Sequence, residues 1–161
     1  IEVGHIFYFG DKYSKPLKCA VDLKDGKKVY VKMGSYGIGV SRLVGAIIEA
    51  KFNNNVMKWP HSVAPYEVVI IPSLKKNDKS NYTRAEKIYN ALIKNKIDVL
   101  LDDTEEHLSA KFKKFDLLGI PYQIILGSES TDNKFEFKDL NGKTEKLSLE
   151  EITNKLLNKR N

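Results

Sequence analysis

Apolar residues follow two successive patterns in the N-terminal part of the chain. The first is β-rich: one apolar stretch covers residues 1–9, and another covers 17–31 around an Asp25-Gly26 pair that is typical of a hairpin turn. The second is helical, because from Val40 the apolar residues recur at three- and four-residue spacing. The pattern predicts two or three antiparallel strands followed by one helix.

A different pattern follows the segment 57–67, whose two prolines disfavour helix in the residues before them. Short continuous apolar runs, typical of strands buried on both faces, here alternate with amphipathic helical stretches. The predicted strands are 66–72, 97–103, 122–127 and, as an edge strand, 134–140, and the predicted helices are 82–94, 110–119 and 149–159. This alternation predicts an α/β domain with parallel strands where helices intervene. The predicted domains are 1–62 and 63–161.

Composition narrows the class of protein. The 161 residues are 42% hydrophobic and 30% charged, and no apolar run approaches the ~20 residues of a membrane span, so we expect a soluble globular protein with no membrane partner. Cys19 is the only cysteine, which excludes an internal disulfide framework, and the three histidines lie far apart in sequence, so we expect no metal site. These features favour a reducing, cytoplasmic location.

The net charge of +6 favours a polyanionic partner, but the charge is unevenly distributed. Residues 1–63 contain ten Lys and Arg against five Asp and Glu, whereas residues 64–161 contain seventeen against sixteen. Any nucleic acid bound by the second part must therefore be held by local patches of charge.

A glycine-rich run, "MGSYGIGVSR", precedes the predicted helix and contains the candidate residues Gly37, Gly39 and Arg42. It lacks the lysine of a P-loop and the third glycine of a dinucleotide fingerprint. One interpretation is that the glycines let a strand pass close to neighbouring groups. The other is that a flat ligand lies on the strand while Arg42 stacks on it or pairs with its phosphate.

Three ordered segments at matching spacing resemble the C-terminal portion of bacterial-type prolyl-tRNA synthetases: "IEVGHIFYFGDKYS", "MGSYGIGVSRLVGAIIE" and "WPHSVAPYEVVIIP". The resemblance implies the end of a class II antiparallel catalytic sheet with its motif 3, followed by a mixed-sheet α/β anticodon-binding domain. It implies an enzyme that activates L-proline with ATP and Mg²⁺ to prolyl-adenylate and transfers it to tRNA(Pro). A homodimer is expected for the full-length enzyme.

The same resemblance assigns roles in the first domain. Arg42 would be the catalytic motif 3 arginine that contacts ATP, on a floor formed by Gly37 and Gly39. The implied proline pocket consists of Glu2, Gly4, His5, Ser35 and Gly37. Without the resemblance, His5 would be interpreted as a hydrogen-bonded core histidine.

In the second domain, the resemblance places anticodon recognition in the charged segment 100–121. Carboxylates can accept from guanine N1 and N2, and cations can donate to O6 and N7. The candidates are Asp102, Asp103, Glu106, Lys111 and Lys114. The alternative is an ordinary solvated helix face. Thr104 and His107 depart from the family pattern, in which many relatives have arginine in this segment.

Two functional hypotheses follow. The first is a fragment of the synthetase that is inactive alone, because class II motifs 1 and 2 are absent from these 161 residues. The second is a noncatalytic RNA-binding or regulatory module that reuses the anticodon-binding fold. Near the domain boundary, Trp59 and Pro60 are expected to fix the linker by packing.

Overall fold

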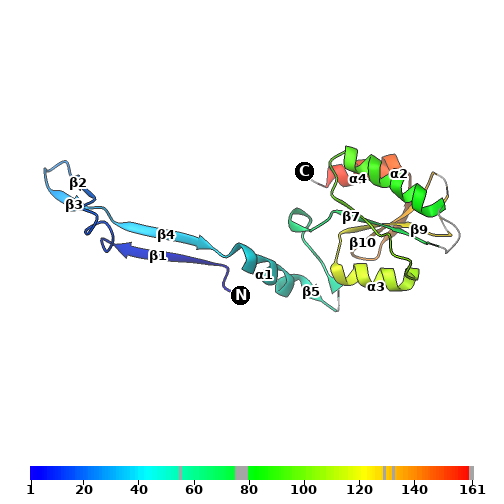
Figure 1. The fold of residues 1–161 in the computed structure, drawn as a ribbon, viewed down its shortest axis with the longest axis horizontal. Helices are drawn as coiled ribbons and strands as arrows, with labels where there is room; N and C mark the ends of the chain where they lie inside the picture. The colour runs from blue at the N-terminus through cyan, green and yellow to red at the C-terminus, as the bar shows by residue number, and fades with distance from the viewer. Residues whose placement is uncertain (55, 75–79, 129, 132, 160–161) are drawn as a thin grey trace. The chain divides into compact units, whose positions relative to one another are not determined.

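The protein is described by a computed structural model that covers residues 1–161 except 55, 75–79, 129, 132 and 160–161. Two compact units compose the chain, residues 1–50 and residues 51–161 (Figure 1). The segment between 51 and the predicted boundary at 62 belongs to the second unit, because it folds back on that unit's own helix. No helix in the described ranges combines the length and the apolar character needed to cross a membrane.

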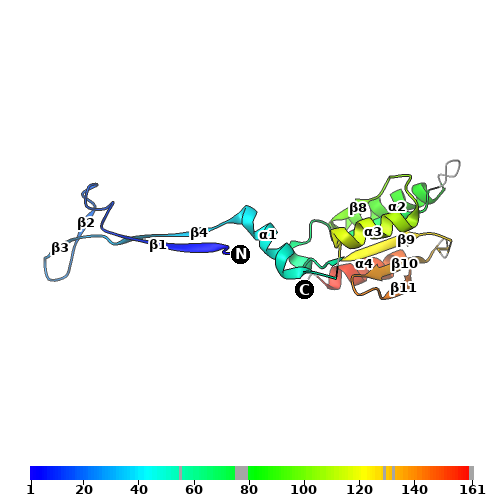
Figure 2. The ribbon, with the colours of Figure 1, turned by 90° about the horizontal axis from the view of Figure 1, so that it is seen from below.

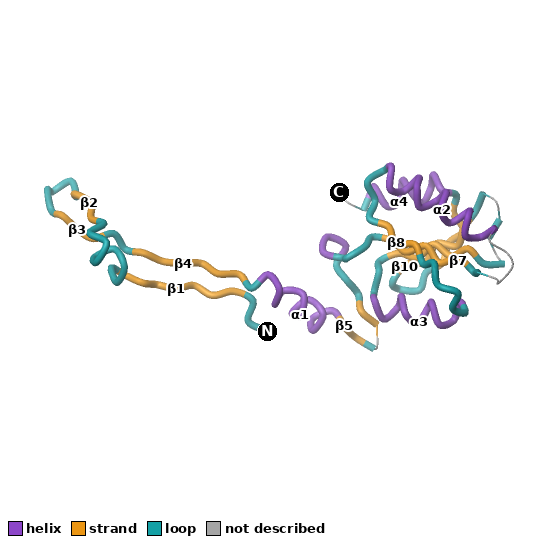
Figure 3. The backbone as a smooth tube through the Cα atoms, in the orientation of Figure 1, coloured by secondary structure: helices purple, strands orange, loops and turns teal. Residues whose placement is uncertain are grey.

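The first unit is built on a long antiparallel pair, β1 (Gly4–Gly10) and β4 (Met33–Ile38), which run side by side in Figure 3. Between them, β2 (Ala20–Asp22) and β3 (Lys28–Tyr30) form the hairpin that the Asp-Gly pair predicts. Gly26 has φ of 79°, which favours glycine at this turn. The helix α1 (Val40–Lys51) follows β4.

One face of the β1–β4 pair is apolar and exposed. The register places Ile6 opposite Tyr36, and alternation along the strands puts Tyr8 and Ile38 on the same face. Each of these four side chains is 70–79% exposed within this chain. A contiguous exposed apolar face of this kind is typical of an interaction surface.

The second unit has a five-stranded mixed sheet whose central strand is β9 (Figures 1 and 2). In sheet order the strands are β11 (Thr144–Leu147), β10 (Phe135–Asp139), β9 (Tyr122–Leu126), β7 (Val68–Pro72) and β8 (Val99–Leu101). β7 pairs in parallel with β8 and β9, while β10 and β11 are antiparallel. The predicted α/β class is confirmed.

Helices cover both faces of this sheet. They are α2 (Ser80–Lys94) and α4 (Leu149–Asn158) on one face and α3 (Leu108–Leu118) on the other (Figure 1). Val68 and Ile70 of β7 pack with the α2 and α4 side, whereas Val69 and Ile71 pack with Phe115 of α3. The continuous apolar run of β7 is therefore buried on both faces, as its pattern predicts.

Two local features differ from the sequence-based expectations. The strand 134–140 was expected at an edge, but β10 lies between β9 and β11, because Gly142 with φ of 82° closes a turn to β11. After α1, the short strands β5 (Phe52–Asn53) and β6 (Val56–Met57) pair with each other, and a 3-10 turn, η1 (His61–Val63), follows.

The segment that enters the second unit is held against the C-terminal end of α3. Trp59 Nε1 donates to the carbonyl oxygen of Leu118 at 3.0 Å, and the side chain of Met57 is buried. Gly119, with φ of 71°, ends the helix, and a Cβ there would lie 2.2 Å from the carbonyl oxygen of Met57. This contact fixes the segment around Trp59 against the second unit.

Gly119→Ala should lower the free energy of unfolding of the 161-residue chain by about 2–4 kcal/mol, because it adds a backbone clash to the cost of a left-handed conformation. Gly142→Ala is the matched control, since its φ is also positive but no atom lies within 4 Å of an added Cβ. The control should lose only about 1–2 kcal/mol. Urea unfolding measures both, and equal losses would contradict the role of the Met57 contact.

Candidate functional site

In the first unit, the β1–β4 register brings three of the predicted proline-pocket residues, His5, Ser35 and Gly37, to one face. His5 lies opposite Gly37 and Phe7 opposite Ser35, so these four positions share the face that is opposite to Ile6 and its apolar neighbours. The ring of His5 lies 4.4 Å from the ring of Phe7, centroid to centroid. Phe7 is a member of this face that the sequence did not single out.

Two contacts connect this face with the start of α1. Glu2 Oε1 lies 3.0 Å from His5 Nδ1, and Arg42 Nη1 donates to the carbonyl oxygen of Glu2 at 3.1 Å. The residues predicted to bind ATP and those predicted to bind proline are therefore brought together by the segment that precedes β1. Gly4 precedes His5 and lies opposite Ile38, so alternation places it on the other face of the pair, with Ile6.

The glycines of β4 and the turn after it differ in what they require. A Cβ at Gly39 would lie 3.2 Å from Cβ of Arg42, a tight approach that glycine relieves next to the arginine stem. A Cβ at Gly37 would meet no atom closer than 3.9 Å. Packing within the unit thus explains Gly39 but not Gly37, whose bare backbone lies beside His5.

The positive character of this end of the unit comes from Arg42 and from its helix. Arg42 lies in the first turn of α1, and that turn contains no acidic residue. The backbone N–H of Leu43 donates to the carbonyl oxygen of Gly39. The amino end of a helix carries partial positive charge, so the guanidinium and the helix both favour an anion. Arg42 can donate in a fork to phosphate or stack on a base.

In the second unit, the predicted anticodon residues lie at the carboxyl ends of the parallel strands. Asp102 directly follows β8, and Lys111 Nζ donates to the carbonyl oxygen of Pro72, the last residue of β7, at 3.1 Å. Ligands of open α/β sheets bind in the crevice outside these strand ends. The location is therefore suited to binding.

Asp102 and Lys111 are buried, in contrast to the expectation that both face the anticodon. Asp102 is 5% exposed and Lys111 is 0% exposed, and Lys111 Nζ lies 3.1 Å from Asp102 Oδ2. Burial alone raises the pKa of Asp102, but hydrogen bonds from Thr104 and Lys111 outweigh it, so this pKa lies below its ordinary value. The two side chains form a buried ion pair whose charged atoms face each other.

The other predicted residues lie around this pair and are accessible. Lys114 Nζ is 2.9 Å from Glu106 Oε2 and 3.6 Å from Asp102 Oδ1, while Asp103 is exposed beside them. The hydrogen bond between Lys114 and Glu106 raises the pKa of the lysine and lowers that of the glutamate. Both groups stay charged at neutral pH.

Thr104 is the residue of this cluster that sequence reasoning missed. Its backbone N–H and its hydroxyl both donate to Asp102 Oδ1, at 3.2 and 2.8 Å, and its hydroxyl lies 3.4 Å from Glu106 Oε2. The signal was present, because Asp followed two residues later by Thr is a common side-chain-to-backbone turn. The hydroxyl therefore lies between the two carboxylates that Lys114 also contacts.

In the part of the chain that the structure describes, no three His, Cys, Asp or Glu residues form a group that could hold a metal ion.

Known proteins resemble this chain along most of its length. The "Anticodon binding domain" family matches residues 67–159. The proline--tRNA ligase of Pelagibacter ubique (strain HTCC1062) is 60% identical over 155 residues, which cover 95% of this chain and 35% of that protein. The proline--tRNA ligases of Wolbachia sp. subsp. Drosophila simulans (strain wRi) and Agrobacterium fabrum (strain C58 / ATCC 33970) are each 50% identical, over 96% and 98% of this chain and 36% of their own lengths.

The chain thus spans about a third of the length of the curated relatives it matches. Their similarity confirms the resemblance to prolyl-tRNA synthetases that the ordered segments indicate, and it includes the first unit as well as the second. The chain belongs to the anticodon-binding-domain family, in the form found in proline--tRNA ligases.

Proposed function

We propose that this chain is part of a proline--tRNA ligase that forms prolyl-adenylate from L-proline and ATP and transfers the prolyl group to tRNA(Pro). Residues 1–62 would complete the class II catalytic domain, and residues 63–161 would bind the anticodon. The observation that carries the proposal is the match of residues 67–159 to an anticodon-binding domain, within a chain that aligns to these ligases over 95% of its length. We further propose a homodimer that acts in the cytoplasm.

The first unit supports the catalytic part of the proposal. Arg42 would neutralise phosphate charge or pack on adenine as the proline carboxylate attacks the α-phosphate, and pyrophosphate leaves in line with that attack. Gly37 would leave the strand bare under the ligand, and Gly39 would give the arginine stem its path. Mg²⁺ bound to the ATP phosphates would supply further charge neutralisation.

The neighbouring residues of that face would hold proline. His5 would pack against the pyrrolidine ring, oriented by its contact with Glu2, and Ser35 on the same face would complete the wall. Gly4 would shape the pocket only through its backbone, because its register position belongs to the other face. The exposed apolar face on the other side of the ladder supports an assignment to a larger sheet, because relatives are about three times as long as this chain. The noncatalytic alternative is not favoured, since the similarity to ligases extends through residues 1–62.

In the second unit, we propose that the accessible and the buried residues of the charged cluster around Asp102 have different roles. Asp103, Glu106 and Lys114 would contact the two guanines that end the proline anticodon, since these side chains are accessible. Asp102 and Lys111 would act through them, by fixing the loop after β8 against the end of β7. A buried pair of this kind positions the neighbouring side chains and does not itself contact the anticodon bases.

The anticodon assignment is tested by titrating tRNA(Pro), and tRNA(Pro) with either guanine replaced, against the 161-residue chain. Lys114→Ala should weaken binding of the natural tRNA by about tenfold, because a contact to a base edge contributes ~1–3 kcal/mol of discrimination, and it should reduce the preference for guanine. Lys87→Ala, an exposed lysine on the opposite face of the sheet, is the control for loss of one charge. Equal weakening for every anticodon would indicate phosphate contact and overturn the assignment.

A further inference from the structure

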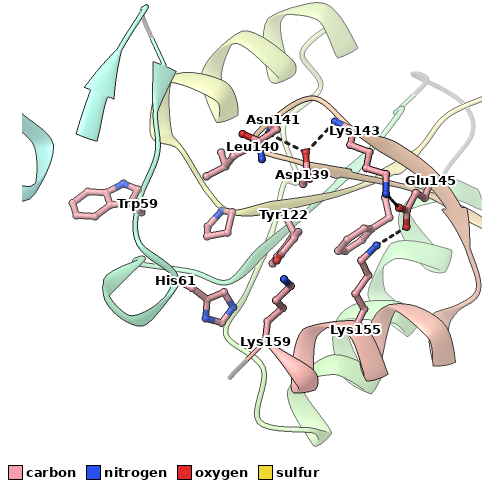
Figure 4. A pocket seen from close by; sticks show the side chains of 12 residues that line it. Trp59, His61, Tyr122, Asp139, Leu140, Asn141, Lys143, Glu145, Lys155 and Lys159 are labelled. Atoms are coloured by element: carbon pink, nitrogen blue, oxygen red, sulfur yellow. Dashed lines mark hydrogen bonds and ion pairs between the residues drawn. The ribbon is translucent and has the colours of Figure 1, made fainter. Parts of the chain in front are cut away.

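A pocket of the second unit lies at the end of the sheet that is opposite to the Asp102 cluster. Tyr122, which lines it, is the first residue of β9 and pairs with Val68 at the start of β7, whereas Asp102 follows the carboxyl end of the parallel strand β8. The cavity has a volume of about 410 Å³, within the range of sites for small ligands. Figure 4 shows its lining.

Aromatic side chains form one wall of this pocket. The ring of Tyr122 stacks on Phe137 with centroids 5.0 Å apart, and the ring of His61 meets Tyr122 edge-on at 6.2 Å. Trp59 is oriented by its hydrogen bond to Leu118 and also lines the cavity. Burial and the nearby Asp139 raise the pKa of Tyr122, so its phenol stays protonated and can donate a hydrogen bond. Flat, rigid rings of this kind bind nucleobases by stacking.

Three lysines also line the pocket, and two of them, Lys143 and Lys155, share the carboxylate of Glu145. Glu145 pairs with Lys143 at 2.6 Å and with Lys155, and these hydrogen bonds lower the pKa of Glu145 to about 2. Asp139 Oδ1 accepts hydrogen bonds from the backbone N–H groups of Asn141 and Lys143, so this carboxylate stabilises the turn between β10 and β11. The carboxylates of the pocket are therefore occupied by protein donors.

Lys159 is the cation that remains. It follows the last turn of α4, and its side chain extends toward the Tyr122 ring in Figure 4. Among the described residues it forms no ion pair with a carboxylate. The lining of this pocket contains three lysines against two carboxylates, a net positive charge beside an aromatic surface, while Glu67 and Asp98 line the adjoining pocket that Lys159 also borders. That combination suits an aromatic ring that carries an anionic group.

We propose that this pocket binds one nucleotide, with its base against the Tyr122 wall and its phosphate at Lys159. A lysine attracts phosphate as a point charge, and the aromatic wall accepts any base, so the site would have little base preference. The nucleotide could be free or could be an unpaired nucleotide of the tRNA. The site is separate from the Asp102 cluster and goes beyond the proposed function.

Trp59 provides the readout, because it is the only tryptophan of the chain and lines the cavity. AMP, adenosine and inorganic phosphate are titrated separately against the 161-residue chain while tryptophan fluorescence is recorded. AMP should produce a saturable change, and adenosine and phosphate should each bind at least tenfold more weakly. No saturable change with AMP at millimolar concentration, together with none with a short single-stranded RNA, would overturn the proposal.

Lys159→Ala should weaken AMP binding by about tenfold, since it removes a charge-assisted contact to phosphate. Lys94→Ala is the matched control, an exposed lysine in the last turn of α2, and it should leave AMP binding unchanged. Equal effects of the two variants would overturn the assignment of Lys159. Displacement of AMP by an acidic peptide without aromatic residues, at equal concentration, would overturn the nucleotide assignment.

The source of the nucleotide is decided by tRNA binding to the same variants. If the pocket binds a tRNA nucleotide, Lys159→Ala weakens tRNA binding equally for all anticodons, whereas Lys114→Ala changes anticodon preference. If the ligand is a free nucleotide, Lys159→Ala weakens AMP binding and leaves the tRNA affinity unchanged. Either result supports the pocket. Because the AMP arm needs no tRNA, failure of the anticodon proposal and failure of this one give different results.

Discussion

Lys111→Met should lower the free energy of unfolding of the 161-residue chain by about 3–5 kcal/mol, because it leaves the buried carboxylate of Asp102 without its cation. Both partners of the pair are almost completely buried, and Lys111 also donates to the carbonyl oxygen of Pro72. Removing the ammonium therefore leaves both an unpaired charge and an unsatisfied backbone carbonyl. Chemical denaturation monitored by circular dichroism measures the loss.

Two further variants control this prediction. Lys113→Met, on an exposed position of the same helix, should change stability by no more than about 0.5 kcal/mol. The double variant Lys111→Met with Asp102→Asn should recover a large part of the loss, because the buried charge is removed together with its partner. A loss in Lys111→Met below about 1 kcal/mol would show that the pair is solvated.

The same pair predicts how stability depends on pH. The pKa of Asp102 lies below its ordinary value of 3.8 in the folded protein, so its contribution is present above that value and is lost as pH falls through the lowered pKa. In Lys111→Met this carboxylate loses its cation and its pKa rises. The stability difference between the two proteins should therefore shrink as the pH falls below about 4. A difference that is constant from pH 7 to pH 3 would contradict the ion pair.

Arg42→Ala in the full-length protein that the proposed function implies should lower proline-dependent ATP–pyrophosphate exchange by about 10²–10³-fold, the range for removing one preorganised group from a developing charge. Its anchor on the carbonyl oxygen of Glu2 fixes the guanidinium beside the His5 face. Binding of tRNA should stay within twofold of the unaltered protein. An exchange rate within threefold of that of the unaltered protein would contradict the proposed contact of Arg42 with ATP.

Two comparisons sharpen this experiment. Arg42→Lys keeps the charge but loses the planar fork, so its activity should lie between those of the alanine variant and the unaltered protein. Lys51→Ala, at the far end of the same helix, removes one charge without touching the face and should leave exchange unchanged. The 161-residue chain by itself is expected to show no exchange, and robust exchange would refute that expectation.

Local patterns along the sequence determined the elements of this protein. The Asp25-Gly26 turn, the helical spacing after Val40 and the continuous apolar run of β7 each depend on neighbours within a few residues, and each element is found where its pattern predicts. Ordered motifs likewise indicated the family, which the relatives confirm. Elements that depend on contacts within a few residues can be predicted from the sequence, because backbone preference and side-chain periodicity are local properties.

Only the tertiary structure decided which charged residues are accessible. Lys111 looks like part of a solvated helix face, but the fold carries it to the carbonyl oxygen of Pro72, thirty-nine residues away in sequence, and to Asp102. Gly37 and Gly39 look equivalent in the sequence, yet only at Gly39 would an added Cβ crowd the arginine stem. Burial and close approach depend on segments distant along the chain, which no local pattern specifies.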